Sequence, residues 1–508
     1  DRGRDRHARE DRFRAYEHYL PLYWEYRTVG VVIHDPIGRG GDTITFEVTT
    51  LWKLVNMQAE LRLFYRGIGT VAEYHDNRPM TPLDNFHYRH QVSTNVPAGR
   101  PLQPGDRVEF EVSQFLDGVP RGRSAYYGTA YLYIVGQGLV PWIGSGARRD
   151  SEPIALSARL GGSTTVHANE SNEPAYAFSQ MATHLAPEHA QTFMRGRRLA
   201  HTSFVDGRHD ESPDNPVWVE HAGKSGPLAI TGACNDCHAR NGRASPPEVG
   251  ASLDQYVFRL GAADGGPDPR LGQVLQPRGG LEPAVRLTGW REARGLRRPE
   301  YGFQDPAPAR SSARITPQLV GLGLLEAIPE ASIVRLADPD DADGDGISGR
   351  ASVVLETTTG LPRLGRFGYK AGQPTVRQQT AAALRTDMGV LTSVYPSPDC
   401  GGEQAGCGAS VAELSDDELD ALTLYVALLG VPAQRGFADA DVVAGEAVFG
   451  AIGCDDCHVG TFTTSERAVH PELRAQVIRP FTDLLLHDLG PELADELGEG
   501  DTTGAEWR

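Results

Sequence analysis

Apolar and polar residues alternate along several short segments in the first third of the chain. These segments are rich in Val, Ile, Tyr and Phe, are separated by Gly, Pro and Asp, and cover residues 28–34, 43–49, 59–65, 107–112 and 129–135. Because successive side chains of a strand point to opposite faces, the alternation predicts half-buried strands. Several such strands with turn residues between them predict a β-sandwich.

The pattern changes beyond a stretch rich in Gly, Ser and Thr at residues 144–170, which we interpret as a linker. Residues 186–200, 415–429 and 442–452 are predicted helices. The second of these begins with Ser415 and three acidic residues, an N-cap followed by charges that complement the helix dipole. The third helix leads directly into a cysteine-containing segment.

Two segments have the sequence Cys-x-x-Cys-His, the attachment signature of c-type haem. The first contains Cys234, Cys237 and His238, and the second contains Cys454, Cys457 and His458. In this signature two thioether bonds hold the porphyrin, and the adjacent histidine is the proximal iron ligand. The alternatives are a zinc site or redox-active dithiols, and a histidine directly after the second cysteine in both segments disfavours them. We therefore predict two covalently bound haem c groups.

These observations together predict a multidomain protein. An N-terminal all-β sandwich is expected to precede two mainly α-helical cytochrome c-type haem domains with long loops. The predicted boundaries are 1–165 for the sandwich with its linker, 166–435 for the first haem domain, and 436–508 for the second. A length of 508 residues is consistent with two or three domains.

Composition excludes several other classes of protein. The net charge of −18 disfavours nucleic acid or an anionic membrane as a partner, and no apolar run is long enough to span a membrane.

The remaining cysteines, Cys400 and Cys407, are close enough in sequence to form a local disulfide. Covalent haem attachment and disulfides both indicate a compartment outside the bacterial cytoplasm. The charged start of the chain lacks a signal peptide, so we expect a mature periplasmic or extracellular protein.

From about residue 166 onward the chain resembles the di-haem oxidoreductase family, peroxidase-like proteins related to bacterial di-haem cytochrome c peroxidases and to the enzyme that matures tryptophan tryptophylquinone. The resemblance rests on the first haem segment and its continuation to Pro247, and on segments 321–330, 338–350, 365–371 and 483–488. It implies an oxidoreductase that passes electrons through two haems to a peroxide or another oxidant. Tyr369 stands where the family usually has Trp. The chain also ends at Arg508, where the family continues, so we expect the second haem domain to be truncated.

The group on the far side of each iron decides the chemistry. Met388 and His487 are candidate distal ligands, because a thioether or an imidazole can complete a six-coordinate haem. Either side chain could instead fill the core.

A peroxidase also needs a group that moves protons near an open iron position. Glu326 lies in an apolar helical segment where burial would raise its pKa, and the resemblance implies an essential glutamate on a comparable segment. A helix-end Glu paired with Arg is the alternative. Gln273 and Gln276 are the competing pocket residues, and Tyr369 is a candidate electron relay or a residue that packs on a porphyrin.

An acidic loop at residues 338–346 resembles the first half of a calcium-binding EF-hand loop. Asp341, Asp343 and Asp345 occupy alternate positions and Gly346 follows, whereas Ser352 stands where the closing Glu would be. We therefore predict a Ca²⁺ site, with a solvated acidic turn as the alternative. Related di-haem enzymes often hold calcium between their haem domains.

The leading hypothesis is an exported di-haem peroxidase-like oxidoreductase with a small redox protein as its electron donor or acceptor. The alternative is a di-haem electron-transfer subunit of a larger complex with no catalysis of its own. In a third hypothesis the β region binds a protein or a polymer and recruits the haem module to it.

Overall fold

The computed structural model describes residues 2–4, 29–65, 76–118, 125–127, 131–145, 150–166, 174–210, 217–226, 229–251, 253, 255–262, 266–276, 285–293, 295–303, 307–402, 404, 411–495 and 497–508. Of the predicted site residues, Cys407 lies outside this part of the chain. Among the described residues, no helix is long and apolar enough to cross a membrane.

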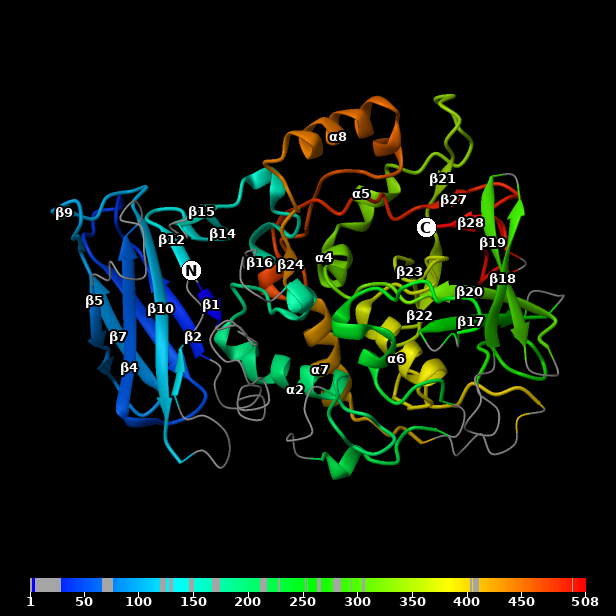
Figure 1. The fold of residues 1–508 in the computed structure, drawn as a ribbon, viewed down its shortest axis with the longest axis horizontal. Coiled ribbons are helices and arrows are strands. Elements are labelled where there is room, and N and C mark those ends of the chain that lie inside the picture. Colours follow the sequence, from blue (N-terminus) through cyan, green and yellow to red (C-terminus); the bar gives the residue numbers. More distant parts are fainter. Residues whose placement is uncertain are drawn as a thin grey trace.

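Two antiparallel sheets form the N-terminal part of the molecule (Figure 1). The first has the strand order β1-β2-β3-β7-β6, with bounds Arg2–Arg4, Val29–His34, Ile44–Thr50, His87–Val92 and Thr81–Pro82. The second has the order β13-β12-β10-β4-β5, with bounds Gly138–Val140, Tyr131–Ile134, Arg107–Leu116, Leu54–Tyr65 and Asp76–Pro79, and β11 (Ala125–Tyr127) pairs with β10. A short hairpin joins β8 (Thr94–Asn95) and β9 (Arg100–Pro101).

The apolar faces of the two sheets share one core. Phe46 of β3 and Phe110 of β10 are fully buried, and their ring centroids lie 5.0 Å apart in an edge-to-face contact. Along β3, buried residues alternate with partly exposed ones, as the sequence pattern indicates. The hairpin of β14 (Trp142–Ser145) and β15 (Asp150–Pro153) then leads to the rest of the chain.

The remaining chain packs short helices around a second core (Figure 1). Its α-helices are α2 (Ala190–Ala200), α3 (Cys234–Cys237), α4 (Leu322–Ala327), α5 (Glu330–Val334), α6 (Val376–Asp387), α7 (Asp416–Ala427) and α8 (Ala440–Ala451). Helix α7 begins at the predicted N-cap, where Ser415 and Glu418 form a capping box. The 3₁₀ turns are η2 (Leu156–Ala158), η3 (Gly162–Thr164), η4 (Pro174–Ser179), η5 (Pro187–His189), η6 (Val219–His221), η7 (Ala239–Asn241), η8 (Cys454–Asp456) and η9 (Pro471–Leu473).

Close packing of α2 on α7 depends on a glycine. Phe193 of α2 and Tyr425 of α7 are both fully buried, with ring centroids 5.1 Å apart. A Cβ atom on Gly196 would lie 2.0 Å from the carbonyl oxygen of Ala421. Only a residue without a side chain allows the two backbones to approach this closely.

Small sheets occupy the segments between the helices. The pairs are β16 (Thr165–Val166) with β24 (Val431–Pro432), β17 (Tyr256–Gly261) with β20 (Arg310–Ile315), β18 (Val285–Ala293) with β19 (Leu296–Phe303), β22 (Val353–Glu356) with β23 (Leu361–Leu364), and β25 (Phe462–Thr463) with β26 (Val477–Ile478). A three-stranded sheet has the order β21-β27-β28, with bounds Gly349–Arg350, Leu486–Asp488 and Glu506–Trp507.

The predicted fold class is therefore wrong in its description of the haem-binding part. The structure is 21% helix and 31% strand, and two mainly α-helical haem domains are not found. The longest described helices have 12 residues, and hairpins fill much of the intervening chain. With 58 Gly and 35 Pro in the sequence, helices are repeatedly interrupted, and the chain satisfies its backbone hydrogen bonds in short sheets and turns instead. The three predicted domain boundaries stay a prediction.

Candidate haem sites

The first Cys-x-x-Cys-His segment forms one tight helical turn. Helix α3 spans the two cysteines, and the carboxylate of Asp236 accepts a hydrogen bond from the backbone N of Ala233 at 3.0 Å. The backbone N of His238 donates to the carbonyl oxygen of Cys234 at 2.9 Å. Both cysteines and the histidine are therefore presented by the same turn.

The histidine of this segment is oriented by the carbonyl of a residue distant in the sequence. His238 Nδ1 lies 2.7 Å from the oxygen of Pro317, and since a carbonyl can only accept, the proton is on Nδ1. The lone pair is then on Nε2, the atom that an iron ion would bind. Burial lowers the pKa of His238 to about 4, so the imidazole is neutral, as a metal ligand must be.

The second segment repeats this arrangement. The backbone N of His458 donates to the carbonyl oxygen of Cys454 at 3.0 Å, and His458 Nδ1 donates to the carbonyl oxygen of Phe481 at 2.9 Å. Two separate segments thus fix the same tautomer with the same type of acceptor.

None of the four cysteines of the two segments is disulfide-bonded. Burial raises the pKa of Cys234 and of Cys237 to about 12, and burial also raises the pKa of Cys457. Redox-active dithiols need an accessible thiolate, whose pKa is lowered. The raised pKa values of Cys234, Cys237 and Cys457 therefore disfavour a redox-active dithiol.

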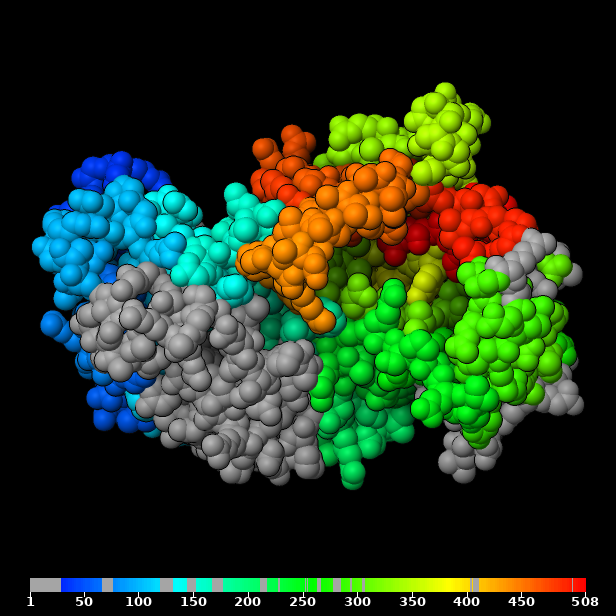
Figure 2. All heavy atoms as spheres, turned by 45° about the horizontal axis from the view of Figure 1, so that its top comes forward, coloured from blue at the N-terminus to red at the C-terminus, as the bar shows by residue number. Residues whose placement is uncertain are grey.

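Helix α8 presents an apolar surface beside the second segment. None of its residues is buried, and Val443, Val448 and the adjacent Ile452 are 55%, 56% and 69% exposed. The ring of Phe449 lies 5.8 Å from the ring of His458. A hollow lies between α8 and the body of the molecule (Figure 2). An apolar group held by this segment would cover the exposed face of α8, so the residues fit a haem.

Met388, a predicted distal ligand, lies beside the first segment. The sulfur of Met388 lies 4.0 Å from Cys234 Sγ, and Met388 is buried. Gln276 is also buried, and its Nε2 donates to the carbonyl oxygen of Thr386 at 3.4 Å. The structure therefore brings Met388 to the first segment and Gln276 to the end of α6, whereas the backbone N of Gln273 donates to Asp399.

Sequence reasoning missed Asp387, which lies between Thr386 and Met388 in the chain. Burial raises its pKa to about 6, and its charge contributes to the raised pKa of both Cys234 and Cys237. Thr386 Oγ1 donates to its Oδ1 at 2.8 Å. A signal was present in the sequence, since Asp387 directly precedes the one methionine downstream of the first haem segment.

His487 lies beside the second segment, with Nδ1 4.0 Å from Cys457 Sγ. Both ring nitrogens have partners, because Nε2 is 2.8 Å from Asp483 Oδ2 and Nδ1 is 3.0 Å from the oxygen of Ser348. Its hydrogen bond to Asp483 raises the pKa of His487. Both nitrogens are occupied by these partners, so distal ligation, which stays a prediction, requires one of the two hydrogen bonds to open.

Glu326 belongs to α4, and its side chain contacts the first residue of α6. Met388 directly follows the other end of α6. The Oε2 atom of Glu326 accepts a hydrogen bond from the backbone N of Val376 at 2.6 Å, and burial raises the pKa of Glu326. Helix α6 has 12 residues, which is a length of about 18 Å. The contact satisfies a backbone N–H in the first turn of α6, beside the N-cap residue Thr375, and the predicted catalytic role remains open to test.

Tyr369 is half-buried, and its hydroxyl donates to the carbonyl oxygen of Ile315 at 2.7 Å. This acceptor is two residues before Pro317, the partner of His238. The structure thus brings Tyr369 to the proximal side of the first segment.

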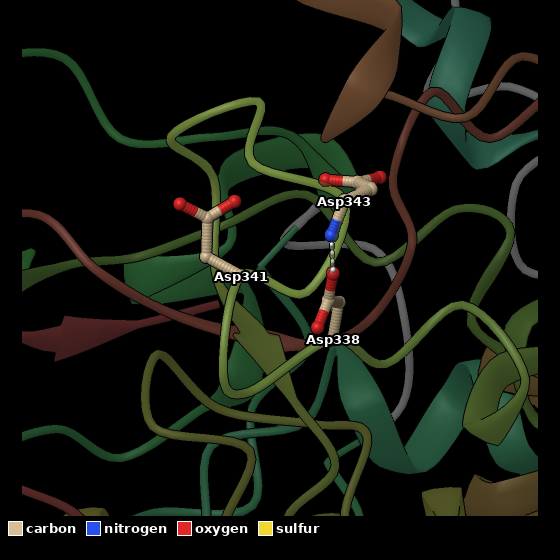
Figure 3. Close-up of side chains that lie close together, drawn as sticks. All are labelled: Asp338, Asp341 and Asp343. Atoms are coloured by element: carbon tan, nitrogen blue, oxygen red, sulfur yellow. Dashed lines mark hydrogen bonds between the residues drawn. The ribbon is translucent and has the colours of Figure 1, made fainter.

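The acidic loop gathers a slightly different set of carboxylates from the predicted one. Among the described residues, Asp338, Asp341 and Asp343 form the group whose ligand oxygens all lie within 4.8 Å of one another (Figure 3). Asp338 accepts from the backbone N of Asp343 at 3.4 Å, and Asp345 accepts from the backbone N of Ile347 at 2.7 Å. Calcium binding by Asp341, Asp343 and Asp345 stays a prediction.

Cys400 is disulfide-bonded. Its predicted partner, Cys407, lies outside the described residues, so the pairing stays a prediction.

Comparison with known proteins supports the family predicted from the sequence. Residues 306–508 match the family described as "Di-haem oxidoreductase, putative peroxidase", which confirms the resemblance. The match contains the second haem segment, and the first segment lies before it. No curated protein matches the chain.

Two solved structures align with parts of the chain. One is titled "Crystal structure of Br derivative BhCBM56" (16% identity, 26% of this chain, 98% of that chain, TM-score 0.15). The other is titled "Crystal structure of carbohydrate-binding module family 56 beta-1,3-glucan binding domain" (12% identity, 21% of this chain, 96% of that chain, TM-score 0.14). TM-scores this low carry no conclusion about fold or ligand.

Proposed function

We propose that the two Cys-x-x-Cys-His segments each hold a covalently bound haem c, and that the protein is an exported di-haem oxidoreductase that reduces peroxide. The observation that carries this proposal is the repeated orientation of the histidines. His238 and His458 both donate from Nδ1 to a backbone carbonyl, at 2.7 and 2.9 Å, and both direct the lone pair of Nε2 away from that carbonyl. A proton held on Nδ1 leaves Nε2 able to bind a metal, which is what a proximal ligand requires.

The reaction is H₂O₂ + 2 H⁺ + 2 e⁻ → 2 H₂O. Haem iron, when bound, supplies an open coordination position for the peroxide and carries the electrons that reduce it. A small redox protein is the proposed source of those electrons. The protein's own residues hold the two haems, orient the proximal ligands and deliver the protons.

The first haem is the proposed site of peroxide reduction. Asp387 lies near both cysteines of its attachment segment and supplies a carboxyl group that can carry a proton. Gln276 is bonded to the neighbouring Thr386 and supplies an amide that can orient a peroxide. The second haem is the proposed site of electron entry. Its segment borders helix α8, which has no buried residue and lies at the surface of the molecule, where a redox partner has access to the haem.

Export follows from the chemistry of the cysteines. Haem is attached to Cys-x-x-Cys-His segments outside the bacterial cytoplasm, and the disulfide at Cys400 is stable in the same compartments.

A Ca²⁺ ion at the acidic loop is a further part of the proposal. Its carboxylates repel one another unless a cation neutralises them.

The decisive experiment is the electron paramagnetic resonance spectrum of the oxidised, haem-loaded protein before and after peroxide is added. We expect a high-spin ferric signal beside a low-spin one, with the high-spin signal lost on addition of peroxide. Two low-spin signals that peroxide leaves unchanged, even after partial reduction, would overturn the peroxidase proposal. They would instead support the alternative, an electron-transfer subunit without catalysis of its own.

A further inference from the structure

The segment from Ile315 to Pro317 connects Tyr369 to the proximal histidine of the first haem segment. The Tyr369 hydroxyl donates to the carbonyl oxygen of Ile315 at 2.7 Å. The carbonyl oxygen of Pro317, two residues later, accepts from His238 Nδ1 at the same distance. A shift of this short stretch of backbone would therefore move the hydrogen-bond acceptor of His238.

The same stretch is also held at Thr316, the residue between Ile315 and Pro317. Thr316 Oγ1 donates to the carbonyl oxygen of Gln255 at 2.8 Å, and the carbonyl oxygen of Thr316 accepts from the backbone N of Ala244 at 3.0 Å. Tyr369 thus completes a set of bonds that fixes the backbone just before Pro317.

Tyr369 is itself held by the last residues of the chain. The backbone N of Arg508 donates to its carbonyl oxygen at 3.0 Å, and its ring makes an edge contact with the ring of Trp507, with centroids 6.4 Å apart. Trp507 belongs to β28, where it lies opposite His487 of β27. His487 Nδ1 is 4.0 Å from Cys457 Sγ of the second haem segment. A continuous set of contacts therefore runs from one haem segment to the other, through the three-stranded sheet beside the C-terminus (Figure 1).

The surroundings of these two rings disfavour their oxidation. Arg314 and Lys370 lie over the ring of Trp507, at 4.5 and 3.9 Å from its centroid, and two cations oppose formation of a radical cation there. A tyrosine loses its proton on oxidation, and the partner of Tyr369 is a carbonyl, which is a weak base. Positioning explains the contacts better than electron transfer through the rings does.

We propose that Tyr369 is a positioning residue for His238, and that Trp507 extends this mechanical link to the second haem segment. The inference rests on the proposed haem binding and concerns how the first haem is tuned. A firmly held Pro317 carbonyl keeps the His238 hydrogen bond short. A short bond makes the imidazole a stronger donor to iron, which favours the ferric state.

The test is Tyr369→Phe in the haem-loaded full chain, with the reduction potential of each haem measured by spectroelectrochemical titration. The variant keeps the ring and removes the hydroxyl that holds Ile315. We expect the first haem to become easier to reduce by three- to tenfold in its reduction equilibrium constant, or about 30–60 mV for one electron. The spectrum of the first haem should shift, and the potential of the second haem should change less.

The matched control is Tyr65→Phe. The Tyr65 hydroxyl also donates to a backbone carbonyl, that of Thr94, at 2.7 Å, in the N-terminal β region. This control should leave both potentials unchanged. If Tyr369→Phe holds two haems and leaves the first potential and spectrum unchanged, the positioning role is overturned while haem binding stands. If the wild-type chain binds no haem, the proposed function itself fails.

A second variant tests the link to the other haem segment. Trp507→Phe removes the indole N–H, which donates to the carbonyl oxygen of Leu493 at 3.1 Å, and loosens the contact with Tyr369. We expect it to shift the first potential in the same direction as Tyr369→Phe. The double variant should shift it by less than the sum of the two, because both act through one set of contacts. Fully additive shifts would overturn the mechanical link.

Discussion

Glu326 offers the sharpest test, because its sequence pattern and its contacts predict different results for one substitution. If it transfers protons, Glu326→Gln should lower turnover about 10²–10⁴-fold. If it holds the start of α6, the same variant should be nearly silent, since the Gln carbonyl can still accept from the backbone N of Val376. We expect the second result, because the carboxylate already has this partner at 2.6 Å.

Removal of the acceptor should be costly. Glu326→Ala leaves the N–H of Val376, a buried residue, without its partner. An unsatisfied buried donor costs about 2 kcal/mol, while the N-cap of α6, Thr375, stays in place. For a cooperative unit of roughly 150–250 residues this corresponds to a melting temperature lower by about 4–8 °C.

The pH dependence of Glu326→Gln has a definite sign. Burial raises the pKa of Glu326 above 4.5, so the folded state favours the neutral carboxyl and loses stability as pH rises through the folded pKa. Gln is always neutral. The variant should therefore be as stable as the wild type at pH 4, and as stable or more stable at pH 8.

Thermal unfolding followed by circular dichroism at pH 4 and pH 8, with peroxide turnover measured in parallel, checks both expectations. Glu330→Gln is the matched control. It removes a charge from the neighbouring helix α5, where Glu330 pairs with exposed Arg363, and should shift the melting temperature by less than about 2 °C. A loss of turnover of 10²-fold or more in Glu326→Gln, with its haems and melting temperature intact, would refute the interpretation that Glu326 only holds the start of α6.

Three further predictions concern the haem segments, the C-terminal sheet and the helix packing. Replacing Cys234 and Cys237 together with Ala should lower the covalent haem content from two to one per chain in a pyridine haemochrome assay, and two remaining haems would contradict the attachment. Arg350 lowers the pKa of Glu506 to about 2, so this ion pair stabilises the fold above pH 4.5 and the effect is lost as pH falls toward 2. Glu506→Gln should therefore cost about 1–3 kcal/mol at pH 7 in thermal unfolding, and a difference that stays constant down to pH 3 would argue against it. Gly196→Ala should destabilise the α2–α7 contact by about 1–3 kcal/mol, because the added Cβ would lie 2.0 Å from the carbonyl oxygen of Ala421. An unchanged melting temperature would show that the two helices can move apart.

The sequence by itself determined features whose chemistry lies in neighbouring residues. Cys-x-x-Cys-His places two thiols and a ligand on one turn, so its meaning does not depend on the rest of the fold. The same holds for the capping box of Ser415 and Glu418, and for the alternating strands such as β3. Helical content was overestimated, because cytochrome-like segments suggest helices while hairpins between them have no comparable local signature.

The tertiary structure decided every feature that joins distant residues. The carbonyls of Pro317 and Phe481 are separated from their histidines by 79 and 23 positions, and no local pattern marks them. Packing also gives Glu326 a backbone partner 50 residues away. It brings Asp387 to the first haem segment as well. A local pattern fixes which groups a segment offers, whereas the free energy of burial and of satisfied hydrogen bonds fixes which groups meet.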